Sequence, residues 1–370
     1  MNAVRFAAPD DPRAAVELAD LIHDLDQLTR EIALRSIPPA DFDSGANRVT
    51  LAELLLTERR FDEALHHANT LPVAAKGDVT LCRRAQSVGR DVFHALWSDL
   101  QGQVTASGIV NVQSLLTRAI ALYAPTPDPL PRSGKIQNVA ILANDDLYQC
   151  KLYRADQKAD QLRAQNTRCR IYLQSRDVAA LHADLAQYDA VIFQRNPAFP
   201  DIAALMIDAA KQGIATFYDI DDLIFDAEHF PPPLDTYAGQ IDAAQHSAIA
   251  CGVPLFAAAA RLCDVGIAST EPIRQALAPL TGSGTAFTHQ NALGAAHLAA
   301  MRHVRSLPSD KVVLFYGSGT KAHKEDFREV LEPALARVLA QRPGKVEVRL
   351  MGDFPAHSHL DPSHPDVTVI

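Results

Sequence analysis

The sequence has few cysteines, no excess of basic residues and no long apolar run. Its five cysteines form no C-x-x-C pair, a spacing typical of a reducing cytoplasm rather than of a disulfide framework. The net charge of -9 argues against a general nucleic-acid binder, which usually carries a basic patch. The longest apolar run, Ala248 to Ala260, contains Gly and Pro and is shorter than the roughly 20 residues of a membrane span.

The N-terminus also lacks the apolar segment of a secretory signal. We therefore expect a cytoplasmic protein without a transmembrane segment, either free or peripheral at the inner face of a membrane. Its 370 residues are enough for two or three domains, and 48% hydrophobic with 21% charged residues is ordinary for a globular protein.

The first third of the chain shows apolar residues at helical spacing only, and we predict an all-α domain over residues 1–124. The clearest segment, Leu51 to Leu71, resembles a tetratricopeptide helical hairpin with Phe61 at the position of the repeat's aromatic residue. Only one such copy is evident, whereas repeat arrays need about three for stability. A plain helical domain and a repeat array both remain open. Either could bind a protein partner.

A proline-rich stretch, residues 125–136, predicts a linker because each proline removes a donor and disfavours helix before it. Beyond it, short β-branched runs alternate with helical segments over residues 137–295, as in a parallel sheet built from βαβ units. A second unit of this type occupies residues 310–370. These some 60 residues are fewer than a doubly wound domain of ~100–150 residues needs, so we expect most of that domain to lie beyond Ile370.

The stretch FYGSGTKAHKEDF follows an apolar strand and precedes an amphipathic run, which is the local pattern of a phosphate-binding turn. The Walker pattern fails because Lys321 stands one place late and no hydroxyl follows it. A dinucleotide pattern matches at Gly317, Gly319 and Ala322, but the acidic residue expected about 20 positions on is missing at that spacing. Cations at a helix start fit a bound anion, although a solvated surface turn remains the alternative. The predicted anion-binding residues are Gly317, Gly319, Thr320, Lys321, His323 and Lys324.

Three aspartates, Asp219, Asp221 and Asp222, follow a predicted buried strand. Ligand crevices of open parallel sheets lie beyond the carboxyl ends of the strands. Carboxylates there can bind a hard cation, accept hydrogen bonds from the hydroxyls of a sugar-like ligand, or cap a following helix, and all three interpretations stay open.

Three cations are predicted at the same edge. Arg154 and Lys158 are four residues apart on one face of the helix after the first strand, and Arg195 follows the third strand. Surface scatter explains each singly, but their shared location favours a common site. The histidines of AHSHLDPSH, His357, His359 and His364, include an H-x-H pair that can bind zinc, although a polar loop explains them equally well.

From about Gln137 onward the chain resembles bacterial GT-B glycosyltransferases, the large retaining group that includes family 4. The matching segments are QCKLYRADQK, VIFQR, FYDIDDLIF, HQNAL and FYGSGTKAHKEDF, in the expected order and at the expected separations. The resemblance implies an α/β fold of the GT-B type: a Rossmann-like acceptor-side domain over 137–295 and part of a Rossmann-like donor-side domain over 310–370, preceded by the all-α domain. Asn291 matches the asparagine that ends the first domain of this group.

The resemblance also implies transfer of a sugar from a nucleoside-diphosphate (NDP) sugar to a glycan or lipid-linked acceptor, in cell-envelope polysaccharide synthesis. The glycine turn would bind the donor diphosphate, and no cofactor or metal is expected because GT-B enzymes generally work without one. The residues placed on the acceptor side of the cleft are Tyr153, Arg154, Lys158, Arg195, Asp219, Asp221 and Asp222. Two alternatives remain: a helical-repeat interaction protein with an inactive transferase half, and an NAD(P)-dependent oxidoreductase.

Overall fold

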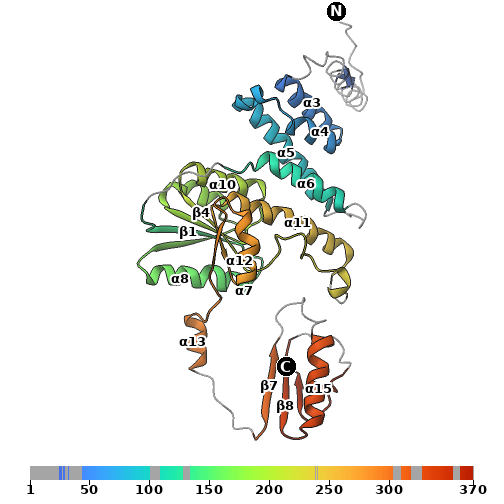
Figure 1. Cartoon of the computed structure of the whole chain (residues 1–370), viewed down its shortest axis with the longest axis vertical. Helices are drawn as coiled ribbons and strands as arrows, with labels where there is room; N and C mark the ends of the chain where they lie inside the picture. Colours follow the sequence, from blue (N-terminus) through green and yellow to red (C-terminus); the bar gives the residue numbers. More distant parts are fainter. Residues whose placement is uncertain are drawn as a thin grey trace, which may run out of the picture.

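The computed structural model describes residues 44–100, 109–127, 134–237, 239, 241–302, 310–317, 327–352 and 359–369, with residues 25, 26, 28, 29 and 32. Three units follow one another along the chain: a helical segment, a six-stranded sheet with its helices, and a three-stranded sheet with one long helical segment (Figure 1).

The helical segment consists of two antiparallel pairs. Its elements are α3 (Gly45–Thr57), α4 (Phe61–Asn69), the short 3-10 helix η1 (Val73–Gly77), α5 (Val79–Leu100) and α6 (Ile109–Tyr123). The Ser44 hydroxyl caps α3 by accepting from the Asn47 amide, and a three-residue turn with Arg59 in the left-handed region leads to α4. The predicted hairpin between Leu51 and Leu71 is therefore confirmed. In the second pair, α5 and α6 approach closely at Gly89, where an added Cβ would lie 2.8 Å from the Ala119 carbonyl oxygen.

The larger sheet is parallel throughout, with the order β2-β1-β3-β4-β5-β6. Its strands are β1 (Asn138–Ala143), β2 (Arg168–Leu173), β3 (Ala190–Gln194), β4 (Ala215–Ile220), β5 (Val265–Ala268) and β6 (Thr285–Thr288). All six strands fall within residues 137–295, where the sequence predicted a parallel sheet. The α/β prediction is thus confirmed for this unit, which is Rossmann-like in having parallel strands joined by helices.

The helices of this unit connect successive strands. They are α7 (Tyr148–Lys151), the π-helical turn η3 (Leu152–Asp156), α8 (Gln157–Ala164), α9 (Val178–Asp184), η4 (Leu185–Gln187), α10 (Pro200–Lys211), η5 (Leu234–Tyr237), α11 (Ala243–Leu262), α12 (Glu271–Leu277), η6 (Ala278–Leu280) and α13 (Ala295–Met301). The helical segment predicted after the first strand, which carries Arg154 and Lys158, begins at Tyr148 and contains the π turn. Because β2 lies on one side of β1 and β3 to β6 follow on the other, β1 and β3 are neighbours, and their carboxyl ends form the topological switch point of the sheet.

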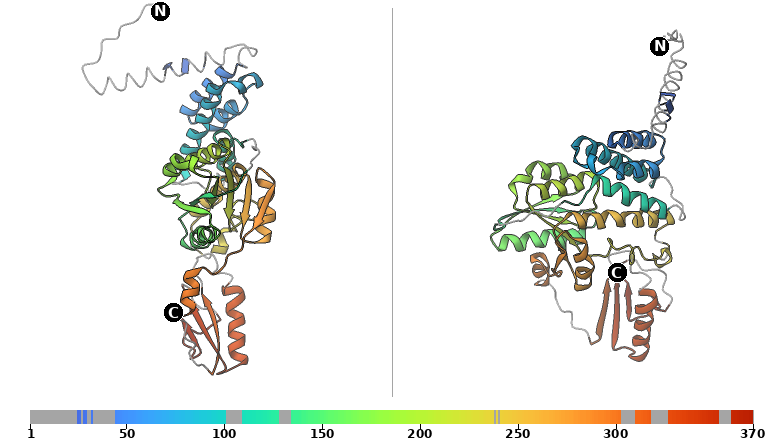
Figure 2. Two further views of the ribbon diagram at one scale, coloured as in Figure 1. Left: turned by 90° about the vertical axis from the view of Figure 1, so that its left-hand side faces the viewer. Right: turned by 45° about the horizontal axis from the view of Figure 1, so that its top comes forward.

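The helical segment packs directly on the sheet unit. Figure 2 shows α6 alongside α11, and the two units share one apolar core. The ring of Phe199, just before α10, meets Phe93 and Trp97 of α5 edge-to-face, and the Tyr123 hydroxyl donates to the Ala198 carbonyl at 2.8 Å. The predicted boundary at residue 124 stays a prediction, but the two sides of it are not independent in their packing.

Helix α11 is the one helix among the described residues that is long and apolar enough to cross a membrane, with a mean hydropathy of 1.3 over its most apolar part. Half of that part is buried, and α11 packs against α6 and α10. Its apolar character is thus explained by its place in a core.

The last unit contains β7 (Val312–Gly317), the π-helical turn η8 (Phe327–Leu331), α15 (Glu332–Gln341), β8 (Val346–Met351) and β9 (Val367–Val369). Its strands are parallel in the order β7-β8-β9, as predicted for a second unit of the βαβ type. A small separate core joins Phe327, Leu335 and Leu339 to Val348 and Leu350. Figure 1 shows the carboxyl ends of β7 and β8 on the side of this unit nearer to the six-stranded sheet.

Candidate functional site at the sheet edge

The predicted charged residues do converge at the carboxyl edge of the six-stranded sheet, but they form two separate groups. One group, Arg154, Lys158 and Asp219, is buried. The other, which surrounds Arg195, Asp221 and Asp222, is partly open to solvent. The difference matters because only the second can contact a ligand without rearrangement.

The buried group is centred on the carboxylate of Asp219, the penultimate residue of β4. Its Oδ1 accepts from Arg154 Nε at 2.8 Å, and Lys158 Nζ lies 2.6 Å from its Oδ2. The side chains of Asp219 and Arg154 are 0% exposed. Burial lowers the pKa of Lys158, and the neighbouring Asp219 only partly offsets this.

This buried group also holds the chain that leaves β6. Arg154 Nη1 donates to the carbonyl of His289 and to Asn291 Oδ1, the latter at 3.1 Å. Burial and the two nearby cations lower the pKa of His289, so its ring is neutral at pH 7. Asn291, expected to end the first domain, is therefore hydrogen-bonded to the helical segment that follows β1. Asp219, Arg154 and Lys158 act here as a structural clamp.

The open group is built on Arg195, directly after β3. Its backbone has φ 55°, a left-handed conformation that costs a non-glycine residue energy. Its Nη1 donates to both oxygens of Asp146 at 3.0 and 3.1 Å, and its Nη2 lies 3.8 Å from Asp222. The arginine side chain is 11% exposed, whereas those of Asp146 and Asp222 are 57% and 50% exposed. A nearly buried guanidinium thus holds two solvent-facing carboxylates at the β1/β3 switch point.

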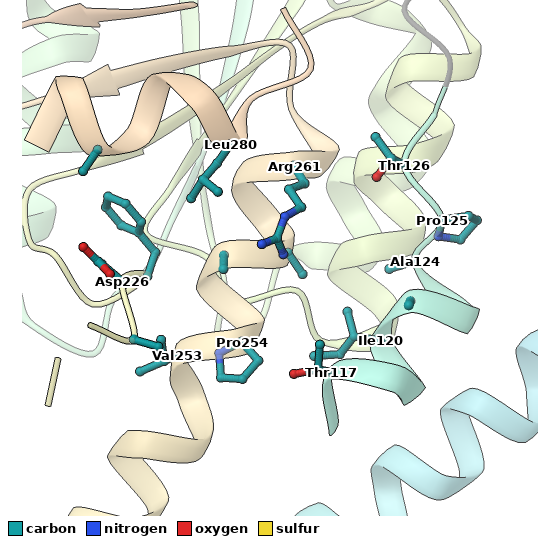
Figure 3. Close-up of a pocket in the computed structure, with 16 residues that line it drawn as sticks. Thr117, Ile120, Ala124, Pro125, Thr126, Asp226, Val253, Pro254, Arg261 and Leu280 are labelled. Atoms are coloured by element: carbon teal, nitrogen blue, oxygen red, sulfur yellow. The ribbon is translucent and has the colours of Figure 1, made fainter. Parts of the chain in front are cut away.

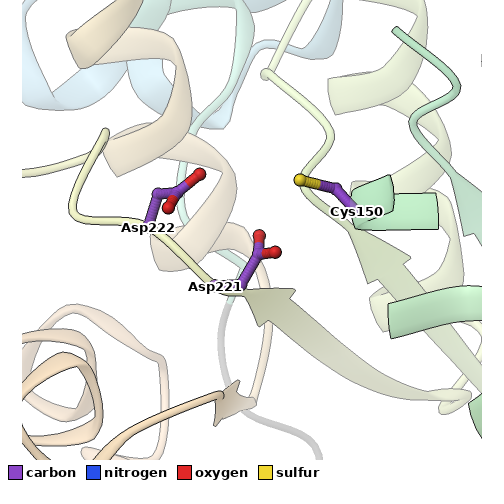
Figure 4. Close-up of side chains that lie close together, drawn as sticks. All are labelled: Cys150, Asp221 and Asp222. Carbon is purple, nitrogen blue, oxygen red and sulfur yellow. The ribbon is translucent and has the colours of Figure 1, made fainter. Parts of the chain in front are cut away.

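Cys150 of α7 completes this edge, and Figure 4 shows its sulfur facing the Asp221 carboxylate. Burial, then the charge of Asp222, raises the pKa of Asp221. Burial, then the charge of Asp221, raises the pKa of the Cys150 thiol to about 12. Both groups are thus disfavoured as anions because they are desolvated beside one another.

The structure bears differently on two interpretations of the aspartates, helix capping and metal binding. The chain after Asp222 continues through turns as far as η5, so no helix directly follows the aspartates for them to cap. Ligand atoms of Cys150, Asp221 and Asp222 lie within 4.8 Å of one another, a spacing that could hold a metal ion. Arg195 competes for Asp222 at the same place, and the absence of a metal requirement remains a prediction.

Three further sets of predicted residues are Tyr153, the glycine turn and the histidines near the end of the chain. The Tyr153 ring stacks on His297 of α13 with centroids 5.6 Å apart, so it packs against the segment that leaves the first domain. Gly317 ends β7 beside Met351, whereas the rest of the glycine turn, Gly319, Thr320, Lys321, His323 and Lys324, lies outside the described residues. Of the three histidines, His357 is also outside them, and His364 Nδ1 accepts from the Asp366 amide at 3.1 Å.

Sequence reasoning missed Asp146, Cys150 and His289. Asp146 could have been found, because it stands three residues after β1 just as the chosen aspartates follow β4. Cys150 carried no signal, since a single cysteine in a helix is usually a core residue. His289 was recognised only as part of the HQNAL match.

The comparisons with known proteins leave the family open. No family model matches the chain, and no curated protein sequence matches it. Among solved structures, an O-GlcNAc transferase mutant from Thermobaculum terrenum superposes with a TM-score of 0.31 and 11% identity, over 87% of this chain and 57% of that one. LpoA from Haemophilus influenzae superposes with a TM-score of 0.22 and 12% identity, over 87% of this chain and 65% of that one. The chain spans less than two-thirds of either protein, and overlaps this weak decide neither its fold nor its activity.

Proposed function

We propose that this chain is a glycosyltransferase of the GT-B type, which moves a sugar from an NDP-sugar to a glycan or lipid-linked acceptor. The observation that carries the proposal is the open group at the switch point. There Arg195, in a strained backbone conformation, holds the half-exposed carboxylates of Asp146 and Asp222. Ligands of doubly wound sheets bind at this location.

The chemistry of this edge suits a polyhydroxylated acceptor. Ionised carboxylates only accept hydrogen bonds, and sugar hydroxyls are good donors. Asp146 and Asp222 would accept from acceptor hydroxyls, and Arg195 would fix their orientation from below. The buried Asp219 plays no direct part in this proposal, which limits the earlier acceptor-side set to Arg195, Asp221 and Asp222 with Asp146 added.

The donor would bind at the glycine turn after β7. The leaving group is a nucleoside diphosphate, whose charge grows as the glycosidic bond breaks. Backbone N–H groups and Lys321 aimed at that charge would stabilise the transition state. This part of the proposal rests on the sequence of the turn and on Gly317 at the carboxyl end of a parallel strand.

The test is calorimetric titration of the protein with UDP, GDP and ADP, comparing wild type with Lys321→Ala. Loss of one charge-assisted contact to phosphate should weaken binding by about 1.5–3 kcal/mol. Lys345→Ala, at an exposed turn before β8, is the matched control and should bind as wild type. Equal affinity of Lys321→Ala and wild type would reject the donor site, and binding of NAD in place of the nucleotides would favour the oxidoreductase alternative.

Transfer itself is assayed with a panel of NDP-sugars and glycan or lipid-linked acceptors. Asp222→Asn should reduce transfer while leaving nucleotide binding unchanged, because the two sites are separate. Activity should persist in excess EDTA, and loss of activity that a divalent ion restores would overturn the proposed metal-free chemistry. We propose further that the reaction takes place on the cytoplasmic side of the envelope, with the helical segment recruiting a protein partner. Co-purification of the full chain from a lysate tests for the partner.

A further inference from the structure

A second cleft lies where the helical segment meets the sheet unit, away from the open group described above. It encloses about 570 Å³ between α6, α11, η6 and the turn after β4 (Figure 3). This volume is in the range of small-molecule sites, ~300–1,000 Å³, which occur preferentially between structural units. The space exists because α11 presents Ala257 and Ala258 here, opposite Ile120 of α6.

The walls of this cleft are fixed rather than free to collapse. Pro254 stands inside α11 and has no N–H, so the carbonyl of Ala250 loses its partner within the helix. Gln113 of α6 donates to that carbonyl through Nε2 at 2.8 Å. This hydrogen bond holds α6 against α11 one turn from the cleft. It therefore fixes the spacing of the two helices that form walls of the cleft.

The cleft is mainly apolar, and its polar lining residues are Thr117, Thr126, Asp226 and Arg261. Arg261 lies seven residues after Pro254, on the same face of α11, and Figure 3 shows its side chain extending into the space that the other labelled residues surround. Within the described part of the chain, Arg261 forms no ion pair or hydrogen bond. The acid on the opposite wall, Asp226, is paired with His229 at 2.8 Å, and this hydrogen bond lowers the pKa of Asp226.

We propose that this cleft binds a small amphipathic anion, with its apolar body against Ala257, Ala258 and Phe225 and its carboxylate or phosphate on Arg261. The charge complementarity is the deciding argument. The guanidinium group of an arginine binds either group through two parallel hydrogen bonds. The apolar walls favour burial of a hydrocarbon body and provide few hydrogen-bond partners for a polar one. The site is independent of the proposed sugar transfer.

The test uses the full chain and three probes of one chain length: decanoate, decyl phosphate and decanol, each titrated below its aggregation limit by calorimetry. We expect both anions to bind and decanol to bind at least about 10-fold more weakly. Decyl phosphate binding more tightly than decanoate would assign a phosphate head, and the reverse order would assign a carboxylate; either supports the proposal.

Three variants make the test specific. Arg261→Gln should weaken both anions about 10-fold or more while leaving the thermal unfolding temperature unchanged, because the side chain is exposed. Arg83→Gln, an exposed arginine of α5 outside the cleft, is the matched control and should bind as wild type. Ala257→Leu narrows the cleft at its apolar wall and should weaken binding of both anions. Wild-type affinity in Arg261→Gln or in Ala257→Leu, or decanol binding as well as the anions, would overturn the proposal.

Discussion

Strands β3 and β7 are both short parallel strands rich in apolar residues, yet they differ in how much of each is buried. Every residue of β3 is buried, and the Phe193 side chain is 0% exposed. Strand β7 leaves Val312 and Phe315 63% and 62% exposed. Strand β3 is paired on both sides, with β1 and β4, whereas β7 is an edge strand that pairs with β8 alone within the described sheet.

The contrast shows that apolar content alone does not decide burial in a parallel sheet. Such sheets are stable when layers cover both faces, and the six-stranded unit has cores on both of its faces. The three-stranded unit has one described core, between its strands and the helical segment from Phe327 to Gln341. An exposed apolar edge such as β7 is where another strand or chain would pair.

The sharpest test of this contrast substitutes the two phenylalanines. Phe193→Ala should lower the free energy of unfolding by about 3–5 kcal/mol, since it opens a cavity in a closed core. Phe315→Ala should cost less than about 1 kcal/mol, since little packing is lost at a surface site. Urea unfolding monitored by circular dichroism measures both. Equal costs would mean that β7 is covered in solution.

The buried clamp gives a second test of the six-stranded unit. Asp219→Asn leaves the buried Arg154 guanidinium and Lys158 ammonium groups without a counter-charge and should cost about 3 kcal/mol or more. The same chemical change at the half-exposed Asp222 should cost under about 1 kcal/mol. If both variants unfold at the same urea concentration, the two groups of charges are not separated as described.

The pH dependence of stability in an Asp221 variant measures how strongly this carboxylate is desolvated at the edge of the sheet. Its folded-state pKa is raised, so ionising the group costs stability; this penalty is absent below the unfolded pKa near 3.8 and complete above the folded pKa. The stability of Asp221→Asn relative to wild type should therefore increase as the pH rises from 4 to 7. A difference that stays constant or falls over this range would show that the carboxylate is well solvated.

The last comparison is between a cysteine of the six-stranded unit and one of the helical segment. At pH 8 a thiol with a pKa of about 12 is ionised to only about one part in 10⁴, so Cys150 should react with iodoacetamide far more slowly than the half-buried Cys82 of α5. Peptide mass spectrometry after timed alkylation measures both rates. Faster reaction of Cys150 than of Cys82 would place its sulfur at an accessible, electropositive site.

The amino-acid sequence by itself determined the elements. The runs NVAILA and AVIFQ form strands, and the alternation with helices forms a parallel sheet, because apolar periodicity and β-branching act over a few neighbouring residues. It also predicted that charges after β1, β3 and β4 would meet, since the carboxyl ends of parallel strands share an edge.

Only the tertiary structure decided which of those charged groups is buried and which is exposed to solvent. Asp219 and Asp221 stand two residues apart at the end of the same strand, yet one lies inside a clamp with Arg154 and the other beside Cys150. Burial depends on helices and loops distant in sequence, such as the chain at His289 that closes over the clamp. The cleft at Arg261 also depends on residues that are distant in sequence. It arises from the packing of α6 against α11, where Gln113 bonds to Ala250, 137 residues later in the chain, and no local pattern encodes it.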